Sequence, residues 1–274
     1  MRLPFILIVF TATLVSGCNN LPDNKVKEDV KIKKEIFITG NDGLSREVLE
    51  SIVEESEILK GGYILIIPVG IPTQEKRLGN LKGRIEKVCP NAVHILELNY
   101  NSPEILPSQK VTVEGAGLIF LIGNRLGRFM NAPWSQVLTE VIFDAYHAGS
   151  TIVGINKAGA LIGEKFIPEE LDNPDAVIKE LPSNITLQNG LNLVNGFIFD
   201  CIYANSIAAE EEQILEFLDK LNKYYVGVPA IGAVFIDENK FIDLGENKTV
   251  VKLSGSDPKW TDIKGLNWEM NTQH

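Results

Sequence analysis

The chain has 274 residues, and 45% of them are apolar, which is enough for a sizeable core. It carries 26 basic against 36 acidic residues, a formal net charge of −10 at pH 7. This acidic balance, with no compensating stripe of Lys and Arg, argues against nucleic acid as a partner. With three cysteines, three histidines and no CxxC pair, we expect no metal and no cofactor.

Residues 1–17 have the features of a signal peptide. A basic start is followed by an almost unbroken apolar run, and small residues then precede Cys18. The run is shorter than the roughly 20 residues that a spanning helix needs. Its ending resembles a bacterial lipobox, which implies that Cys18 is lipidated and becomes the mature N-terminus. The alternative is an ordinary cleaved signal peptide with an incidental cysteine.

Residues 18–34 are polar and charged with no apolar period, so we expect a flexible tether. The resemblance to lipoproteins implies an extracytoplasmic protein attached to the cell envelope through Cys18. Asn19 and Asn20 take the place of the aspartate that favours inner-membrane retention in Gram-negative lipoproteins. The outer membrane is therefore the expected location if the cell is Gram-negative.

A single domain is predicted over residues 35–253, in which short apolar strands alternate with helices. Strands are expected over Glu35–Thr39, Tyr63–Pro68, Ala92–Leu98, Gly117–Ile122 and Thr151–Ile155. Helices are expected after an N-cap at Ser45, over Thr73–Val88 and over Trp134–Ala148. Uninterrupted apolar strands between helices indicate a parallel sheet that is covered on both faces. We therefore predict an α/β fold, a three-layer sandwich with a mainly parallel central sheet.

The C-terminal part of the domain alternates apolar segments with turn residues, which predicts extra strands. They are expected over Phe197–Phe199, Ala230–Ile236, Lys240–Leu244 and Lys248–Leu253, with a β-hairpin around residues 245–247. The polar tail 254–274 has no assigned role. An extracytoplasmic site would permit a disulfide between Cys89 and Cys201, although two cysteines on separate core elements are more often unpaired and buried.

Residues 154–160 read Gly-Ile-Asn-Lys-Ala-Gly-Ala, after the fifth predicted strand and before a helix. A sharp, glycine-rich turn from strand to helix lifts one side chain above the sheet and directs backbone N–H groups at whatever it attacks. The pattern has the shape of a nucleophile elbow, with Lys157 where a serine is expected. The elbow also predicts unusual backbone angles at Lys157.

Four segments together resemble the cyanophycinase and dipeptidase E serine peptidases, which share a fold with class I glutamine amidotransferases. They are residues 119–125, 153–160, 199–203 and 232–238, and their order and spacing agree with the family. The resemblance places Lys157 at the nucleophilic serine and Ile202 at the catalytic histidine. Arg125 takes the place of a substrate-contacting glutamine.

A serine hydrolase needs a hydroxyl nucleophile and a base within hydrogen-bond reach, and here both positions are substituted. We therefore expect a catalytically silent, membrane-anchored pseudoenzyme that acts as a binding or scaffold module. The alternative is an active serine-type or rearranged exopeptidase or amide hydrolase that acts on Asp-containing or cyanophycin-like peptides.

The candidate ligand-binding residues are Asn124, Arg125, Lys157, Asp200 and Cys201. Lys157 is a solvated lysine, a contact for an anion, or an amine nucleophile with a lowered pKa. Cys201 is a buried structural thiol or a nucleophile in a rearranged site. Asp200 could pair with Arg125 or Lys157. The expected ligand is a small anion or an acidic peptide end.

Overall fold

The computed structural model describes residues 33–40, 42–167, 187–203, 224–237, 240–244, 250–252 and 261–262. These residues belong to one compact unit. The predicted signal peptide 1–17, Cys18 and the tether up to residue 32 lie outside the described residues, as does the tail except for residues 261–262. In the part that is described, no helix is both long enough and apolar enough to cross a membrane.

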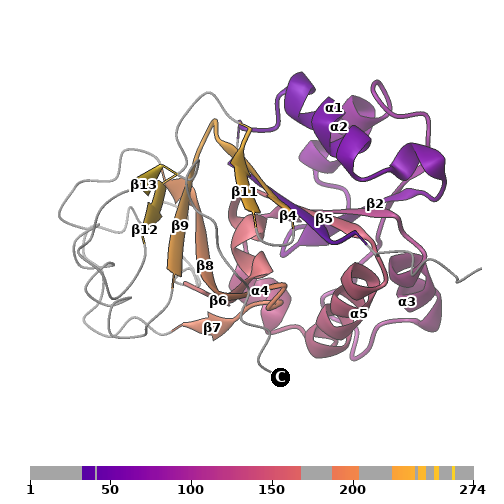
Figure 1. Cartoon of the computed structure of the whole chain (residues 1–274). Helices are drawn as coiled ribbons and strands as arrows, with labels where there is room; N and C mark the ends of the chain where they lie inside the picture. Colours follow the sequence, from indigo (N-terminus) through magenta and orange to yellow (C-terminus); the bar gives the residue numbers. More distant parts are fainter. Residues whose placement is uncertain are drawn as a thin grey trace, which may run out of the picture. The chain divides into compact units, whose positions relative to one another are not determined.

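A seven-stranded sheet forms the centre of the domain (Figure 1), in the spatial order β11-β10-β1-β5-β4-β2-β3. Its strands are β1 (Glu35–Thr39), β2 (Ile64–Val69), β3 (Val93–Ile95), β4 (Leu118–Gly123), β5 (Thr151–Ile155), β10 (Ala233–Asp237) and β11 (Lys240–Asp243). The five strands from β1 to β3 in this order are parallel, whereas β10 and β11 are antiparallel to their neighbours. The mainly parallel sheet is therefore confirmed.

Helices cover both faces of this sheet, because its strands β1, β2, β4 and β5 are buried on both faces. The helices are α1 (Arg46–Glu55), α2 (Lys76–Ile85), α3 (Pro107–Glu114), α4 (Leu126–Met130) and α5 (Ser135–His147), with short 3₁₀ helices η1 (Ile58–Lys60) and η2 (Asn156–Ile162). Phe37 and Phe120 pack with α1 and α2 in one core cluster. Their neighbours Ile38 and Leu121 pack with α3 to α5 in the other. The three-layer prediction is confirmed (Figure 1).

The predicted start of α1 is also confirmed. The Ser45 hydroxyl accepts a hydrogen bond from the backbone N–H of Val48 at 3.2 Å, which satisfies one of the N–H groups that a helix start leaves unpaired. The predicted apolar stripe of this helix is buried, as the periodicity indicated: Val48, Leu49, Ile52 and Val53.

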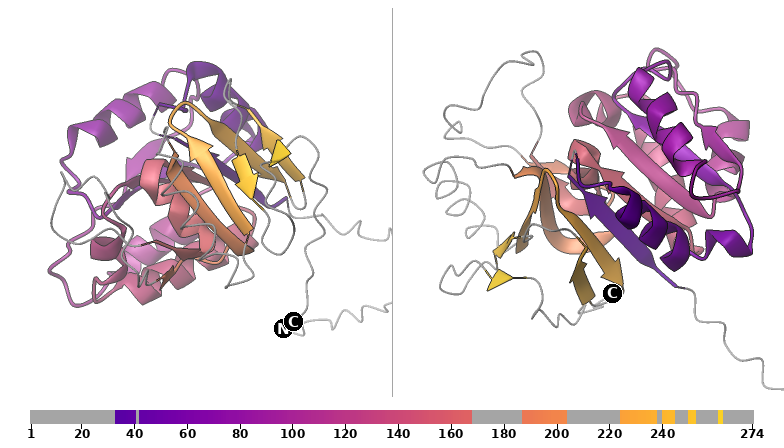
Figure 2. Two further views of the ribbon diagram at one scale, coloured as in Figure 1. Left: turned by 90° about the vertical axis from the view of Figure 1, so that its left-hand side faces the viewer. Right: turned by 90° about the horizontal axis from the view of Figure 1, so that it is seen from above.

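A second, six-stranded sheet lies beside the first (Figure 2), and the sequence analysis did not predict it as a separate sheet. Its order is β13-β12-β9-β8-β6-β7. The strands are β6 (Gly163–Phe166), β7 (Gln188–Asn189), β8 (Val194–Tyr203), β9 (Tyr224–Pro229), β12 (Val250–Lys252) and β13 (Thr261–Asp262). Apolar side chains from β8 and β9 join the same core cluster as α3 to α5, so the two sheets share a hydrophobic core.

The predicted β-hairpin around residues 245–247 is wrong. β11 pairs with β10, with Asp237 opposite Lys240, whereas β12 pairs with β9 and β13 in the second sheet. The strands on either side of residues 245–247 therefore belong to different sheets. Turn residues between two apolar segments are compatible with a hairpin, but they do not determine which strand each segment pairs with.

Cys89 and Cys201 are both free and buried, so the structure contains no bridge between them. Cys89 packs among the side chains of α1 and α2, whereas Cys201 belongs to the cluster shared with the second sheet. The two cysteines thus lie in different layers of the domain.

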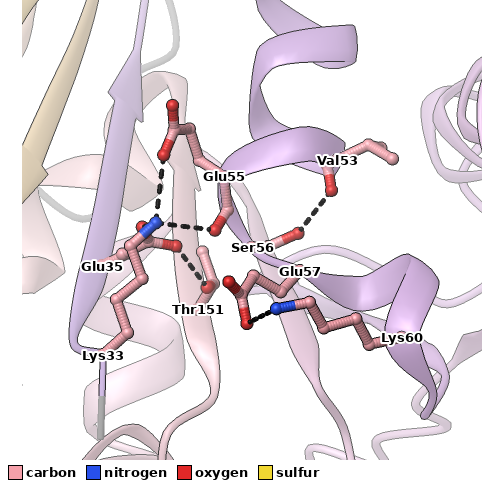
Figure 3. A network of polar contacts seen from close by, with 8 residues as sticks. All are labelled: Lys33, Glu35, Val53, Glu55, Ser56, Glu57, Lys60 and Thr151. Atoms are coloured by element: carbon pink, nitrogen blue, oxygen red, sulfur yellow. Dashed lines mark hydrogen bonds and ion pairs between the residues drawn. The ribbon is translucent and has the colours of Figure 1, made fainter. Parts of the chain in front are cut away.

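A carboxylate is buried at the point where the chain enters the first strand (Figure 3). Glu35 is 1% exposed, and it forms an ion pair with Lys33 and accepts a hydrogen bond from the Thr151 hydroxyl at 3.3 Å. Lys33 also donates to the Glu55 carboxylate at 3.0 Å. Burial raises the pKa of Glu35, and the attraction of Lys33 offsets this effect only in part.

Replacing Glu35 with glutamine should therefore raise stability relative to wild type at pH 7.5, and the gain should vanish near pH 4. A pKa that is higher in the folded chain makes the unfolding free energy fall as pH rises through it. The glutamine variant has no carboxylate to ionise and does not lose this stability. Its advantage over wild type in unfolding free energy is about 1.4 kcal/mol for each unit by which folding raises the pKa of Glu35. Urea unfolding of both proteins at several pH values measures the difference.

Glu57→Gln is the matched control for this experiment. Glu57 is exposed beside Lys60 at 2.7 Å, and the hydrogen bond from Lys60 lowers its pKa. The stability of that variant relative to wild type should therefore not rise with pH. A difference between Glu35→Gln and wild type that stays constant from pH 4 to pH 7.5 would contradict the assignment.

Candidate functional site

The turn after β5 is tightly folded back on its strand. Asn156, the first residue of the 3₁₀ helix η2, adopts a left-handed backbone conformation with φ of 58°. A Cβ atom on Gly154 would lie 2.5 Å from the Cα atom of Gly159. The two glycines therefore allow the turn to pack directly against the strand, as a nucleophile elbow requires.

The left-handed residue of this elbow is Asn156, and not Lys157. The elbow predicts unusual backbone angles at Lys157, whereas the positive φ is found one residue earlier in the chain. Lys157 is the second residue of η2 and does lie in the turn that follows the fifth strand, as expected. It is half-buried at the carboxyl end of the sheet.

Lys157 and Asp200 interact electrostatically at this end of the sheet. Burial lowers the pKa of the Lys157 ammonium, and the Asp200 carboxylate opposes that effect. Asp200 lies near the end of β8, and it accepts a hydrogen bond from the buried Tyr225 hydroxyl at 2.7 Å. Of the two partners considered for Asp200, the structure therefore brings it close to Lys157.

Cys201 is a buried thiol in the core, which favours the structural interpretation over the nucleophilic one. A Cβ atom on Gly159 would lie 2.6 Å from its Sγ atom, so β8 packs closely against η2 at this point. Burial and then the Asp200 carboxylate raise the pKa of the Cys201 thiol well above its ordinary value. Both effects disfavour the thiolate that a cysteine nucleophile needs. Ile202 follows in the same strand.

Asn124 and Arg125 lie on a different side of the site. They follow β4 and line a cavity of about 220 Å³ together with residues that follow β2. Lys157 and Asp200 do not line this cavity. The candidate residues thus form two groups, Lys157 with Asp200 at the elbow and Asn124 with Arg125 one strand away.

The histidines that the structure describes are remote from the elbow. His94 lies opposite Leu65, near the amino end of β2, and packs edge-on against Tyr63. His147 ends α5 before β5 begins, so it lies at the opposite end of that strand from Asn156. The third, His274, lies outside the described residues.

The structure adds three residues that the sequence analysis missed. Tyr225 comes from a strand that was not predicted, and Arg77 and Arg128 line the same cavity as Arg125. Arg128 follows Arg125 at a spacing of three, which would have indicated a common helical face had α4 been predicted. Among the described residues, no group of three or more His, Cys, Asp or Glu side chains could hold a metal ion.

Comparisons with known proteins support the fold at this point. No protein-family model matches the chain, and neither does any curated protein sequence. A peptidase from an acI-B1 Actinobacterium has a similar structure, with a TM-score of 0.54 and 16% identity over 84% of this chain and 94% of that one. A candidate Peptidase E from Listeria monocytogenes EGD-e has a TM-score of 0.51 and 19% identity over 78% of this chain and 100% of its own. The chain therefore has a peptidase-like α/β fold.

Proposed function

We propose that this protein is a lipid-anchored envelope protein that uses a peptidase-like fold for binding or scaffolding and does not perform serine-type hydrolysis. The observation that carries the proposal is the chemistry of the elbow. Its left-handed residue is Asn156 and the next is Lys157, where the mechanism requires a hydroxyl or thiol nucleophile. Both described histidines lie at the other end of the sheet, and the position that the resemblance assigns to the catalytic base is Ile202.

The charges at the elbow favour a particular class of ligand. Lys157 offers an ammonium group, and Asp200 offers a carboxylate beside it. A bare anion would be attracted by the first and repelled by the second. An acidic peptide end carries carboxylates together with backbone N–H donors, so it can satisfy both groups. We therefore favour an acidic peptide end over a simple anion at this position.

The alternative function, a rebuilt hydrolase, depends on Lys157. Burial lowers the pKa of its ammonium, which is the direction that a nucleophilic amine needs. The neighbouring Asp200 carboxylate acts in the opposite direction and stabilises the ammonium. An ammonium has no lone pair for attack, so the carboxylate beside Lys157 works against nucleophilic catalysis by its amine.

Serine-directed labelling of the full-length protein in detergent tests the proposal. Wild type should not react with a fluorophosphonate probe, and Asp-containing dipeptides and cyanophycin should survive incubation with it. Turnover is expected to be at least ~10⁴-fold below that of an enzyme with an intact triad, because both the nucleophile and the base are substituted. Mass spectrometry of the protein and of the peptides provides the readout.

Four variants make the test specific. Lys157→Ser and Asn156→Ser each add a hydroxyl at the elbow without a base, so neither should be labelled. Lys157→Ser combined with Ile202→His restores both groups, and any labelling is expected first in that variant. Turnover by wild type that is lost on Lys157→Ala would show instead that the site has been rebuilt around the amine.

A further inference from the structure

The cavity next to Asn124 lies where the chain reverses its direction across the central sheet. From β2 the chain proceeds through α2 to β3 at one edge, and it then returns to β4 on the other side of β2. α2 packs on one face of the sheet, whereas α4 and α5, which follow β4, pack on the other. In open α/β sheets, ligands bind outside the carboxyl ends of the strands at such a reversal.

Residues from both connections line this cavity, which we call the β2/β4 crevice. Val69 and Gly123, the last residues of the two strands, are paired, so the two connections start side by side. The residues that follow β2 and β4 enclose about 220 Å³: Gly70, Ile71, Pro72, Glu75, Arg77, Asn124, Arg125 and Arg128. The crevice is one strand away from the elbow, because β5 pairs with β4 on the far side.

The charge of the crevice is strongly positive in a chain that is otherwise acidic. Three guanidinium groups line it against the single carboxylate of Glu75. Glu75 lies 3.4 Å from the Nε atom of Arg77, and both side chains are more than one-third exposed, so this pair is weak. Arg125 is exposed and has no carboxylate partner among the residues that the structure describes. Among the described residues, Arg77 therefore has one weak carboxylate partner and Arg125 has none.

Arg128 is positioned by an uncharged aromatic ring, so this contact does not neutralise its positive charge. Its guanidinium carbon lies 4.6 Å from the centre of the Tyr100 ring, which is a cation–π contact. The Tyr100 hydroxyl donates to the carbonyl of Pro68 at 2.9 Å and accepts from the N–H of Gly70 at 2.6 Å. Burial raises the pKa of Tyr100 to about 12, so the ring carries no negative charge at neutral pH.

The walls of the crevice are in direct backbone contact. Gly70 has a φ of 69°, and a Cβ atom at this position would lie 2.0 Å from the carbonyl oxygen of Arg125. The two connections are thus packed against each other close to the strand ends, and Tyr100 ties the connection after β2 to the sheet. A cavity whose walls are fixed before binding orients its polar groups at a low entropic cost.

We propose that the β2/β4 crevice is a binding site for a small anion with several oxygens, a phosphoryl group or a dicarboxylate, contacted by Arg125, Arg128 and Arg77. The planar guanidinium group matches the geometry of carboxylate and phosphate oxygens and can bind them through two hydrogen bonds. The volume is below the usual range for drug-sized ligands and suits a compact charged group. Lys157 and Asp200 do not line the crevice, so its proposed ligand does not depend on the proposed lack of activity at the elbow.

Isothermal titration calorimetry of the full-length protein in detergent, at low ionic strength, tests this assignment. Inorganic phosphate and succinate are the two probes. Saturable binding of one probe alone identifies the phosphoryl or the carboxylate chemistry, and binding of both identifies a general anion site. If neither phosphate nor succinate gives a heat of binding up to about 10 mM, the proposal is overturned.

Variants of the crevice then locate the bound probe. Arg125→Gln and Arg128→Gln should each weaken binding by about tenfold or more, because each removes a charge-assisted hydrogen bond. Glu75→Gln should tighten binding several-fold, since it removes the competing carboxylate and releases Arg77. A residue that only stabilised the fold would not give this increase in affinity.

Two controls distinguish binding in the crevice from binding elsewhere on the protein. Lys82→Gln removes a positive charge from the same helix as Arg77 but outside the crevice, and it should leave binding unchanged. Lys157→Ala removes the cation of the elbow, and it therefore tells binding at the elbow from binding in the crevice. Binding that is lost in Lys157→Ala but retained in the double variant Arg125→Gln with Arg128→Gln would place the anion at the elbow and refute the crevice.

Discussion

Replacing Gly159 with alanine is expected to lower the free energy of unfolding by about 2–3 kcal/mol. The new Cβ atom would lie 2.6 Å from the Sγ atom of Cys201 and 2.8 Å from the Cγ2 atom of Ile38. Both neighbours are buried, and Ile38 belongs to the central sheet, so neither can move without disturbing the core. Urea unfolding monitored by circular dichroism measures the loss.

A glycine in open space is the control for this substitution. Gly79 lies in α2, and no atom lies within 4 Å of the Cβ that alanine would add there. Gly79→Ala should therefore stabilise the protein by up to about 1 kcal/mol through helix propensity. In the background of Cys201→Ala, Gly159→Ala should cost at least ~1 kcal/mol less than in wild type. Additive effects of the two substitutions would show that Cys201 does not cause the clash.

Replacing Cys18 with serine is expected to release the protein from membranes or to leave an uncleaved precursor. The lipobox-like ending of the predicted signal peptide is the reason that the proposed function places lipid attachment at Cys18. Stable anchoring takes more than one acyl chain, so losing the modified cysteine should remove nearly all membrane binding. Fractionation, gel mobility and metabolic labelling with a fatty-acid analogue measure the change.

Cys89→Ser is the matched control, because it removes a thiol from the folded domain and not from the predicted anchor. This variant should remain in the membrane fraction and keep its lipid label. If Cys18→Ser fractionates like wild type, and neither protein carries a lipid label, the proposed anchor is wrong.

Four of the five parallel strands, β1, β2, β4 and β5, could be predicted because each is a short run of residues that are buried on both faces. The prediction for β5, Thr151–Ile155, agrees with the structure at both ends. α3 was missed because its pattern is weak, with Val113 its only buried residue. The second sheet was missed because β8 pairs with β6 and β9, and such pairings over long sequence distances leave no local pattern.

The candidate site was only partly accessible from the sequence, for a similar reason. The elbow follows from the order of glycines after an apolar strand, and the structure places it there. The amino-acid types at residues 158–160 do not determine backbone angles. Unusual angles were therefore expected at Lys157, whereas the left-handed conformation is found at Asn156. Arg77 and Arg125 are distant in sequence, and only the pairing of β2 with β4 brings their segments together.

The position of the first strand has a consequence for how the chain folds during synthesis. β1 lies inside the sheet, between β5 and β10, with Glu35 opposite Asp237. A nascent chain that ends before residue 233 leaves one edge of β1 unpaired, so the sheet is completed only when most of the chain has been made. Contacts between such distant segments form slowly. Late completion keeps the chain unfolded for longer, which suits the export that the proposed envelope location requires.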